Sequence, residues 1–548
     1  MRLKIYVWLG VFAAVLSLPA QTNVPIRPIS LQQCVQLALE HNFDIAIRRY
    51  DPQIQSYALG GDYGYYDPEF RVRALHTFEA AEGEFDPRTG IQSPPGSGRE
   101  EDIVDGALQG RLWPTGLRYD IGADYQHRTG ETERDIVTRD EHGGPTTVTK
   151  RGFVPFDQYS TAFNIGLEQP LLRDFWIDKG RLDIKLRHKD VRISEFQLLS
   201  TVQDTIRDVE QTYYRLIGAL DSAAAWEASM GLAQKLLVDI RARIDAGQLA
   251  TLDDKQAESE VELRRTELLK VDRTVFAEEN RLKSLISNQP DQWHGVRLVP
   301  QEKLLAVAQS YDLQESWMSG LNSRPDFLRL KEELERQGLV VKYDYNQLFP
   351  YLNAVGTYGR RGFDELTYRK VVDEDVVIGN TTNDITTLVK ARDSHYSHAL
   401  HEVGTEKNLR YSYGVVLRFP LTFRQERYNF KGSKALEARL TAELQQKQQE
   451  IMIDIQDAMQ GIDLAFSRIQ TARRGREAAE VALGAAQQQL DNARATPFSV
   501  LRLQRDLRNL RIEEIEALRD YNVALAELHF REGKILNNKG VNVEISNK

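Results

Sequence analysis

The feature of this 548-residue chain that most limits its possible folds is an internal duplication. The stretch SLQQCVQLALEHNFDI, residues 30–45, returns as DLQESWMSGLNSRPDF, residues 312–327, at a fixed offset of 282. The same offset continues to DPEFRV and FPYLNA, where it pairs Pro68 with Pro350. Two further matches follow in the same order: FNIGLEQPL with YGVVLRFPL at an offset of 250, and TLDDKQA with SVLRLQR at 248. Ordered matches at nearly constant spacing predict two copies of one long structural unit.

Each copy contains a long run of residues with a helical pattern. Apolar residues recur three and four positions apart, a period that predicts helices wrapped around helices as coiled coils. They are Leu199, Val202, Ile206, Val209, Tyr213, Leu216 and Leu220 in the first copy, and Ile455, Met459, Ile462, Phe466 and Ile469 in the second. We therefore expect long helical hairpins over about 173–288 and 432–537. A helix from 173 to 245 would extend on the order of 110 Å, which is more than a compact globular domain needs.

The break between the two helices of each hairpin is short and carries turn and capping residues. Gly247 can adopt the left-handed conformation that ends a helix. Thr251, followed three residues later by Asp254, is a capping-box pattern that starts the next helix. In the second copy, Thr496 followed by Pro497 also predicts a helix start. Each hairpin should therefore turn in a tight tip.

Segments with strand-like alternation separate the helices of each copy. LRYDIGADYQ, residues 117–126, and YSYGVVLRF, residues 411–419, place apolar residues on one face and polar or small residues on the other. We predict strands at about 69–79, 104–112, 117–127 and 159–169 in the first copy, and at 351–360 and 411–421 in the second. The first copy thus has an added hairpin, with Pro114 and Gly116 at its turn. We interpret segments 80–103, 128–158 and 361–409 as long loops.

Such strands fit either a soluble β-sandwich with one wet face or a lipid-spanning β-barrel. The first twenty residues favour the barrel. A basic start, an apolar run and the small-residue site LPA are typical of a secretory signal peptide, and the run is shorter than the ~20 residues of a membrane-spanning helix. No other stretch is apolar and long enough to span a membrane as a helix. Without the signal peptide, 69 basic and 80 acidic residues remain, a net charge of −11 that argues against a nucleic-acid partner.

The single cysteine, Cys34, excludes an internal disulfide and lies inside the repeated helix. We expect it to be a small buried residue.

With these elements the chain resembles the TolC family of outer-membrane efflux and secretion ducts. The resemblance rests on the paired stretches at 30–45 and 312–327, the strand exits QPLL and FPLT, and the tip AGQLATLDDKQAE, and it covers about 28–537. It implies an α + membrane β-barrel fold, with duplicated coiled-coil hairpins forming a trimeric α-barrel and the strands forming a transmembrane β-barrel. Family members commonly contribute four strands per protomer, twelve in the trimer, whereas the six strands expected here would give eighteen.

The resemblance also implies a domain organisation. Residues 1–20 would be the signal peptide and 28–290 the first repeat, with strands over 69–169 and a hairpin over 173–288. Residues 297–537 would be the second repeat, with strands over 351–421 and a hairpin over 432–537, and 538–548 a C-terminal tail.

The function implied by the resemblance is that of a passive duct in the outer membrane of a Gram-negative-type cell, spanning into the periplasm. Its partners would be two further copies in a homotrimer, a periplasmic adaptor (membrane fusion) protein, an inner-membrane transporter and outer-membrane lipid. The alternative is a periplasmic coiled-coil scaffold protein with a soluble β-domain. The sequence names neither the cargo nor the pump.

The resemblance places the functional residues at the hairpin tips. The residues expected to dock the adaptor are Ala246, Gly247, Gln248, Leu249, Thr251, Arg494, Ala495, Thr496, Pro497 and Ser499. The candidates for the channel constriction are Asp253, Asp254, Asp491, Arg494, Ser499 and Arg502. Ser499 and Arg502 stand where family members often carry aspartates, which argues against an acidic ring there. Arg502 could instead pair with Asp253 or Asp254 on a neighbouring helix and latch the tip shut, or these charges could simply solvate a helix end.

We expect no enzymatic activity, no cofactor and no metal site. The sequence lacks a Gly-rich phosphate loop, a nucleophile elbow and a zinc-protease helix motif. One stretch, HYSHALHE, carries metal-ligand residue types at His395, His398, His401 and Glu402, and a helical spacing of three would bring neighbouring imidazoles together. The other interpretation, which we favour, is a polar external loop that happens to be rich in histidine.

Overall fold

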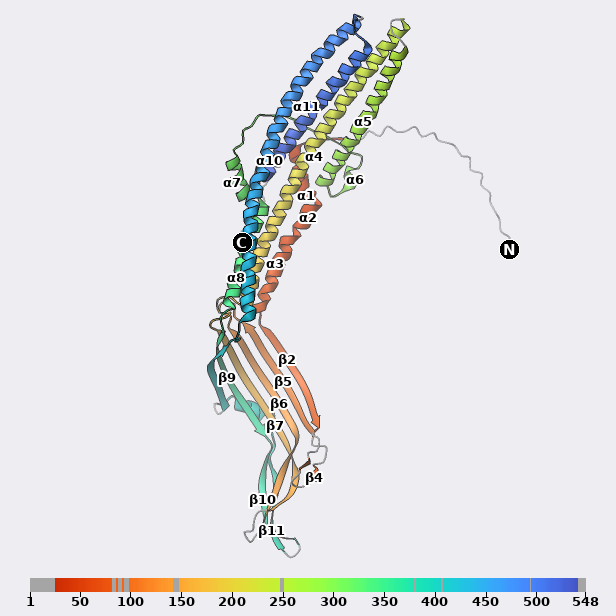
Figure 1. The fold of residues 1–548 in the computed structure, drawn as a ribbon. Helices are drawn as coiled ribbons and strands as arrows, with labels where there is room; N and C mark the ends of the chain where they lie inside the picture. Colours follow the sequence, from red (N-terminus) through yellow and green to blue (C-terminus); the bar gives the residue numbers. More distant parts are fainter. Residues whose placement is uncertain are drawn as a thin grey trace, which may run out of the picture. The chain divides into compact units, whose positions relative to one another are not determined.

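The structure is a computed structural model (Figure 1). It describes residues 25–80, 85–86, 91–92, 98–140, 147–246, 251–378, 381–405, 408–492 and 494–540. The expected signal peptide therefore lies outside the described residues. The chain divides into two compact units. We call residues 1–53, 192–331 and 442–548 the helical unit, and residues 54–191 and 332–441 the sheet unit.

Two long helical hairpins are present where the apolar period predicts them. The first joins α4 (Lys179–Asp245) to α5 (Thr251–Ile286), and the second joins α10 (Arg424–Asp491) to α11 (Pro497–Arg531). α4 begins later than the expected residue 173, because an aspartate caps it: Asp178 Oδ1 accepts a hydrogen bond from the Arg181 N–H at 2.8 Å. α10 begins earlier than the expected residue 432.

The predicted apolar seams form the interior of the helical unit. On α4, Val202, Ile206, Val209, Tyr213 and Leu216 are buried, and they join one core cluster with the repeated helix of the first copy. In the second copy, the buried residues Ile455, Ile462 and Ile469 form a separate cluster that includes Tyr521 of α11. Cys34 is fully buried, as predicted. The apolar residues spaced three and four positions apart therefore lie on the helix faces that pack in the core.

The duplication is visible in the helix and strand bounds. α1 (Leu31–His41) and α7 (Leu313–Ser323) have equal length and are related by the offset of 282. The same offset relates the starts of α2 (Phe43–Arg48) and α8 (Pro325–Asn346), and the starts of β2 (Glu69–Ala80) and β9 (Tyr351–Glu365). At the tips, by contrast, the helix ends are related by 246 rather than by the 248 of the sequence match. The two tips therefore differ in local register.

Short elements complete the two units. They are β1 (Ile26–Ile29), α3 (Tyr50–Tyr63), a 3-10 helix (Gly64–Tyr66), β3 (Phe85–Asp86), β4 (Ile91–Gln92), α6 (Pro290–Trp293), β8 (Arg297–Pro300), α9 (Tyr396–Val403) and α12 (Ile535–Asn538). β1 and β8 pair in parallel and so bring the starts of the two copies together in the helical unit. Among the described residues, no helix is both long and apolar enough to cross a membrane.

All six predicted strands exist and form one antiparallel array in the sheet unit. Its order is β2, β5 (Gly98–Arg111), β6 (Arg118–Asp140), β7 (Thr147–Pro170), β9 and β12 (Leu409–Arg418). The residues predicted as an added hairpin are β5 and β6, which pair with each other and with β2 and β7. In the part of the chain that the structure describes, β2 and β12 do not pair with each other, so the array is an open sheet.

The prediction of three long loops was wrong in large part. β5 begins at Gly98, and β6 and β7 extend far into segment 128–158. Segment 361–409 holds the hairpin of β10 (Thr367–Ile378) and β11 (Thr381–Arg392), as well as α9. The hairpin continues the sheet because β11 pairs with the far end of β6, at Asn383↔Asp140. Strands rich in Thr and Val around charged residues lack the alternation by which the shorter strands were recognised.

Candidate functional site

Near the row that begins at Phe70, the array of six strands has one apolar and one polar face; further along the apolar side, the row through His76 and Asp102 is charged. Residues paired in register lie on the same face of a sheet. One row that runs through all six strands is entirely apolar or aromatic: Phe70, Leu108, Ile121, Ile165, Tyr358 and Tyr411. Its two end members are exposed, Phe70 to 69% and Tyr411 to 66%. A broad exposed apolar face marks a surface that meets something other than water.

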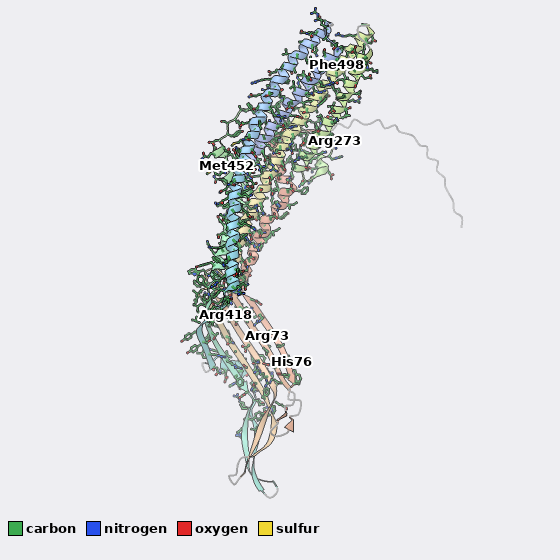
Figure 2. The ribbon with its side chains drawn as sticks, viewed as in Figure 1. Arg73, His76, Arg273, Arg418, Met452 and Phe498 are labelled. Carbon is green, nitrogen blue, oxygen red and sulfur yellow. The ribbon has the colours of Figure 1, made fainter. Side chains whose placement is uncertain are left out.

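The neighbouring row on the opposite face is polar or small. It comprises Glu69, Gln109, Asp120, Gly166, Thr357 and Ser412. Ion pairs link adjacent strands on this face: Arg73 Nε lies 2.6 Å from Asp105 Oδ1, and Arg128 Nε lies 2.9 Å from Glu101 Oε1. Figure 2 labels Arg73 and also His76, which lies on the opposite face of the same strand, β2. The polar face thus carries charges of both signs.

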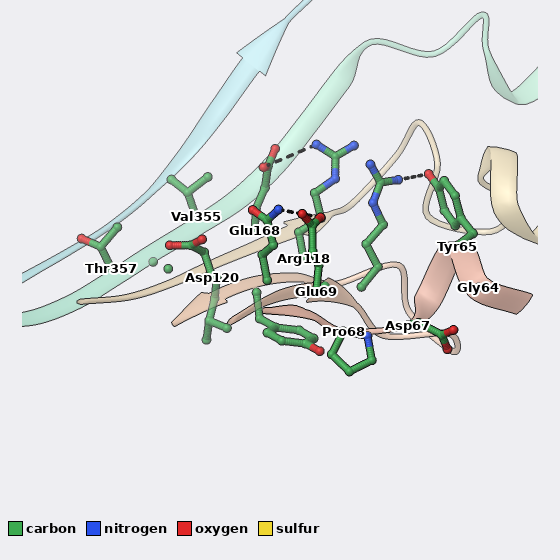
Figure 3. Close-up of a pocket in the computed structure, with 17 residues that line it drawn as sticks. Gly64, Tyr65, Asp67, Pro68, Glu69, Arg118, Asp120, Glu168, Val355 and Thr357 are labelled. Carbon is green, nitrogen blue, oxygen red and sulfur yellow. Dashed lines mark hydrogen bonds and ion pairs between the residues drawn. The ribbon is translucent and has the colours of Figure 1, made fainter. Parts of the chain in front are cut away.

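A hollow of about 810 Å³ opens on this polar face (Figure 3). Across it, Arg118 and Glu168 form an ion pair at 3.7 Å, and Gln109 Nε2 donates to Glu69 Oε2 at 2.9 Å. Arg111 donates to the Tyr65 hydroxyl at its rim. The hollow is lined by strand residues and by the 3-10 helix that precedes β2. Its lining is therefore mostly polar and carries charges of both signs.

The two outer strands of the array each leave one edge open. Among the described residues, β2 pairs only with β5, and β12 pairs only with β9. Every residue of both strands is exposed. Long exposed edges with apolar side chains are rare in soluble proteins, because such edges recruit another strand.

The hairpin tips are joined to one another by an arginine of α4. Arg243 Nη2 lies 2.9 Å from Asp491 Oδ1, and Arg243 Nη1 donates to the Leu490 carbonyl at 2.9 Å. The guanidinium therefore satisfies a carbonyl near the C-terminal end of α10, where a cation is favoured. Within the first hairpin, Arg241 Nε lies 2.6 Å from Asp254 Oδ1.

These contacts give the candidate constriction residues separate surroundings. Asp254 has Arg241 as its partner within the chain, and Asp491 has Arg243. The pairing of Arg502 with Asp253 or Asp254 stays a prediction. Asp253 is half-buried on the first turn of α5. Arg494 is exposed, and its N–H donates to the Gln489 carbonyl.

The candidate docking residues are only partly within the described chain. Ala246 is exposed at the end of α4, whereas Gly247, Gln248 and Leu249 lie outside the described residues. Thr251 begins α5, as predicted. In the second tip, Thr496 caps α11 by accepting from the Ser499 N–H, with Pro497 at the first helical position and Ala495 half-buried before it. The predicted helix start is confirmed.

A basic hollow beside the tips was not foreseen. It has a volume of about 530 Å³ and lies between α5 and α11, where Lys255, Arg502 and Arg505 surround the apolar side chains of Leu263 and Phe498. Phe498 is 60% exposed and is labelled in Figure 2. The sequence does contain a signal for this hollow, because Phe498 is a large apolar residue on an otherwise polar face at the start of α11.

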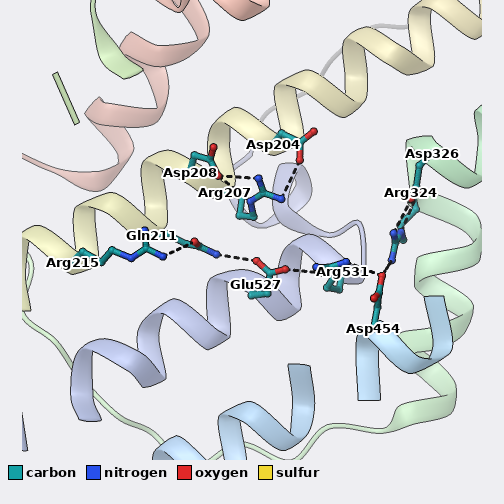
Figure 4. A network of polar contacts seen from close by, with 10 residues as sticks. All are labelled: Asp204, Arg207, Asp208, Gln211, Arg215, Arg324, Asp326, Asp454, Glu527 and Arg531. Atoms are coloured by element: carbon teal, nitrogen blue, oxygen red, sulfur yellow. Dashed lines mark hydrogen bonds and ion pairs between the residues drawn. The ribbon is translucent and has the colours of Figure 1, made fainter. Parts of the chain in front are cut away.

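A polar network lies deeper in the helical unit (Figure 4). Arg324 donates to Asp326 at 2.7 Å and to Asp454 at 3.1 Å, and Arg531 donates to the same Asp454 oxygen at 2.7 Å. Burial alone would raise the pKa of Asp326, but Arg324 and Lys447 outweigh it and hold that pKa at about 2. Asp326 is thus charged at any physiological pH.

The histidine-rich stretch is a helix, so its interpretation as a loop was wrong. α9 lies against β9, where Asp364 accepts from the His395 N–H at 2.8 Å and lies 3.5 Å from His398 Nδ1. Glu402 accepts from the Phe363 N–H at 3.2 Å. The described residues contain no group of three or more side chains placed to hold a metal ion. The contacts of His395, His398 and Glu402 with Asp364 and Phe363 hold α9 against β9.

Comparison with known proteins places this architecture. No family model and no curated protein matches the chain. Solved structures do match it over 92% of its length, and one of them is the CmeC outer membrane channel of Campylobacter jejuni, with a TM-score of 0.58, 15% identity and 85% of that chain covered. Another is the outer membrane protein VceC of Vibrio cholerae, with a TM-score of 0.59, 13% identity and 96% coverage. A membrane protein from Pseudomonas aeruginosa matches with a TM-score of 0.60, 15% identity and 90% coverage.

Proposed function

We propose that this chain, which has the fold of the TolC-type outer-membrane channels predicted from its sequence, is a passive channel of the outer membrane that works as a homotrimer. The sheet unit would cross the membrane, with its apolar face toward lipid and its polar face toward a water-filled passage. The helical unit would lie in the periplasm. The observation that carries the proposal is the two-faced, open-edged array of six strands in a chain with this fold.

The chemistry of the polar face supports conduction rather than catalysis. Arginines and carboxylates both lie on this face, and they form cross-strand ion pairs such as Arg73 with Asp105. A water-exposed channel wall with paired charges should let solutes of either sign pass, because it carries no ring of charges of a single sign that would repel one of them. We therefore propose transport without an enzymatic step and without a cofactor.

The hairpin tips would provide docking and gating. We propose that the docking residues named above bind a periplasmic adaptor protein, which links the duct to an inner-membrane transporter that selects the cargo. The basic hollow around Arg502 and Phe498 suits an acidic partner segment with an apolar side chain. The ion pairs of Asp254 and Asp491 would stiffen the tips, and Arg502 remains the candidate for a latch to an aspartate of a neighbouring copy.

The native mass of the protein extracted from outer-membrane fractions tests the proposal. We expect a trimer that requires detergent and that a high-salt wash does not release. Purified trimers should form discrete conductance steps in planar lipid bilayers. A monomer or dimer in the soluble periplasmic fraction would instead favour the scaffold interpretation and would contradict the channel.

The latch has its own test. Arg502→Glu should raise the leak current through bilayer-inserted trimers if Arg502 holds the tip closed against an aspartate of a neighbouring copy. Arg505→Glu, one turn away and already paired with Glu260 at 2.9 Å, is the matched control for charge reversal. An unchanged leak in Arg502→Glu would eliminate the latch without affecting the channel proposal.

A further inference from the structure

The strands at the two open edges of the sheet run in opposite directions. Every neighbouring pair in the array β2, β5, β6, β7, β9, β12 is antiparallel, and the array has an even number of strands. The β12 edge of one copy can therefore continue into the β2 edge of a second copy without breaking the antiparallel pattern. Large apolar side chains stand along both edges, among them Phe78 at 61% exposure and Tyr413 at 86%.

The chain contains its own template for that junction. By the sequence offsets, β12 is the duplicate of β7 (offset 250), and β2 is the duplicate of β9 (offset 282). β7 and β9 are paired within the chain, with Phe163 opposite Arg360 and Asn164 opposite Gly359. We infer that β12 of one copy pairs with β2 of the next in the same register. The three copies of the proposed trimer then close a barrel of eighteen strands.

The inferred register is specific and keeps the faces consistent. Transferring the β7–β9 pairs by the two offsets places Tyr413 opposite Phe78 and Gly414 opposite Thr77. Tyr413 and Phe78 both lie on the apolar face, two and eight residues from Tyr411 and Phe70 of the apolar row. A register wrong by one residue would place one of them on the polar face.

The same register gives a barrel whose strands tilt slightly more steeply than those of known barrels. The apolar row enters the array at Phe70 and leaves it at Tyr411, and the inferred register sets Tyr411 opposite Ala80 of the next copy. A row that starts at residue 70 of β2 in one copy therefore reaches residue 80 of β2 in the next copy, a register shift of ten residues for every six strands. With a rise of ~3.3 Å per residue and ~4.8 Å between strands, this shift corresponds to a tilt of about 50°, near the 35–45° of known barrels.

An eighteen-strand barrel has a wide bore. At that tilt and spacing, eighteen strands enclose a backbone diameter of about 40 Å, half as wide again as twelve strands would give. β5 and β6 account for the whole difference, because they add two strands per copy between β2 and β7. The inference rests on the proposed trimeric channel and goes beyond it in strand number, register and width.

Disulfide mapping in the full chain tests the register. In a Cys34→Ala background, Thr77→Cys combined with Gly414→Cys should give covalent dimers and trimers on denaturing gels after mild oxidation in outer-membrane fractions, and no larger species. The matched control combines Arg73→Cys with Gly414→Cys. Arg73 lies on the same face as Thr77 but four residues, or about 13 Å, away from it along β2. Each single-cysteine variant should stay monomeric on the gel.

The outcomes separate the inference from the proposed function. Equal bridging of the control pair, or no bridging of Thr77→Cys with Gly414→Cys in a protein that still has the native mass of a trimer, would overturn the register and leave the channel standing. Loss of the trimer mass in the unmodified chain would remove both. If Gly414→Cys lowers the yield, Glu79→Cys with Ser412→Cys tests the same register at the next pair on this face.

Discussion

Arg324 and Asn42 occupy equivalent positions of the two copies, and each joins two helices in a different way. Asn42 accepts from the Asp44 and Ile45 N–H groups and donates to the Leu285 carbonyl, so it caps α2 and fixes it to α5. Arg324 reaches instead to Asp454 of α10. The same joint is neutral in one copy and charged in the other. Duplication preserved the helix starts on either side of the joint, while the polar chemistry at the joint diverged.

The charged joint predicts a dependence of stability on pH. The pKa of Asp326 lies at about 2 in the folded protein against 3.8 ordinarily, so its ionised form is favoured by folding. That contribution, up to ~2 kcal/mol, is complete above pH 4 and is lost as the pH falls from about 4 to about 2. Thermal unfolding followed by circular dichroism should show a shallower pH dependence in this range for Asp326→Asn. An unchanged dependence would mean that other carboxylates dominate.

Cys34 should be chemically silent in the folded protein. Burial, with a smaller effect from the charge of Glu302, raises the pKa of its thiol to about 12. Because the thiolate is the reactive form, iodoacetamide at pH 8 should leave Cys34 unmodified until the helical unit unfolds. Mass spectrometry with and without denaturant measures this directly. Rapid labelling of the native protein would show that the first repeated helix opens readily.

At the scale of single elements, the turn between β5 and β6 depends on one glycine. Gly116 has a φ of +70°, and its N–H donates to the Leu112 carbonyl at 2.9 Å. Gly116→Ala should destabilise the hairpin by about 1 kcal/mol, since a Cβ is disfavoured in the left-handed region. Gly106→Ala, on β5 with 3.9 Å to its nearest new neighbour, is the control and should be nearly neutral. Hydrogen exchange of the β5 and β6 amides distinguishes the two.

The contact between the two hairpins should be measurable in the same way. Arg243→Ala removes both the ion pair to Asp491 and the hydrogen bond to the Leu490 carbonyl. We expect faster hydrogen exchange in the last turns of α10, with little change in α4 itself. Asp491→Asn should have a smaller effect, because the Leu490 hydrogen bond survives. Equal exchange in all three proteins would show that helix packing alone holds the tips together.

The elements also show what a single sequence can and cannot reveal. The helices were predictable because their apolar residues keep one period over several helical turns, as from Leu199 to Leu216. The six strands of the array were predictable because their two faces meet different environments. β10 and β11 were not, because their segment has no clean alternation. The tip contacts of Arg243 were missed as well, since they join residues 248 positions apart and depend on how two hairpins pack.

At the scale of the whole molecule, the width of the passage should follow the number of strands. Deleting residues 81–146 removes β5 and β6 and leaves β2 next to β7, with the antiparallel pattern intact. If conductance follows the cross-section of the barrel, twelve strands in place of eighteen should lower the single-channel conductance to roughly 0.4 of its value. Planar-bilayer recordings in one salt solution measure the ratio. A trimer with unchanged conductance would place the narrowest point elsewhere.

The pairing of β7 with β9 has a kinetic consequence for a ring built from such chains. A closed trimer contains six junctions between repeats, but the chain itself supplies three of them at the high effective concentration of linked segments. Only the three junctions between chains require separate protomers to meet by diffusion. The rate of assembly should therefore rise with the third power of protomer concentration at most. A single-repeat ancestor would have had to bring six separate chains together in a dilute membrane.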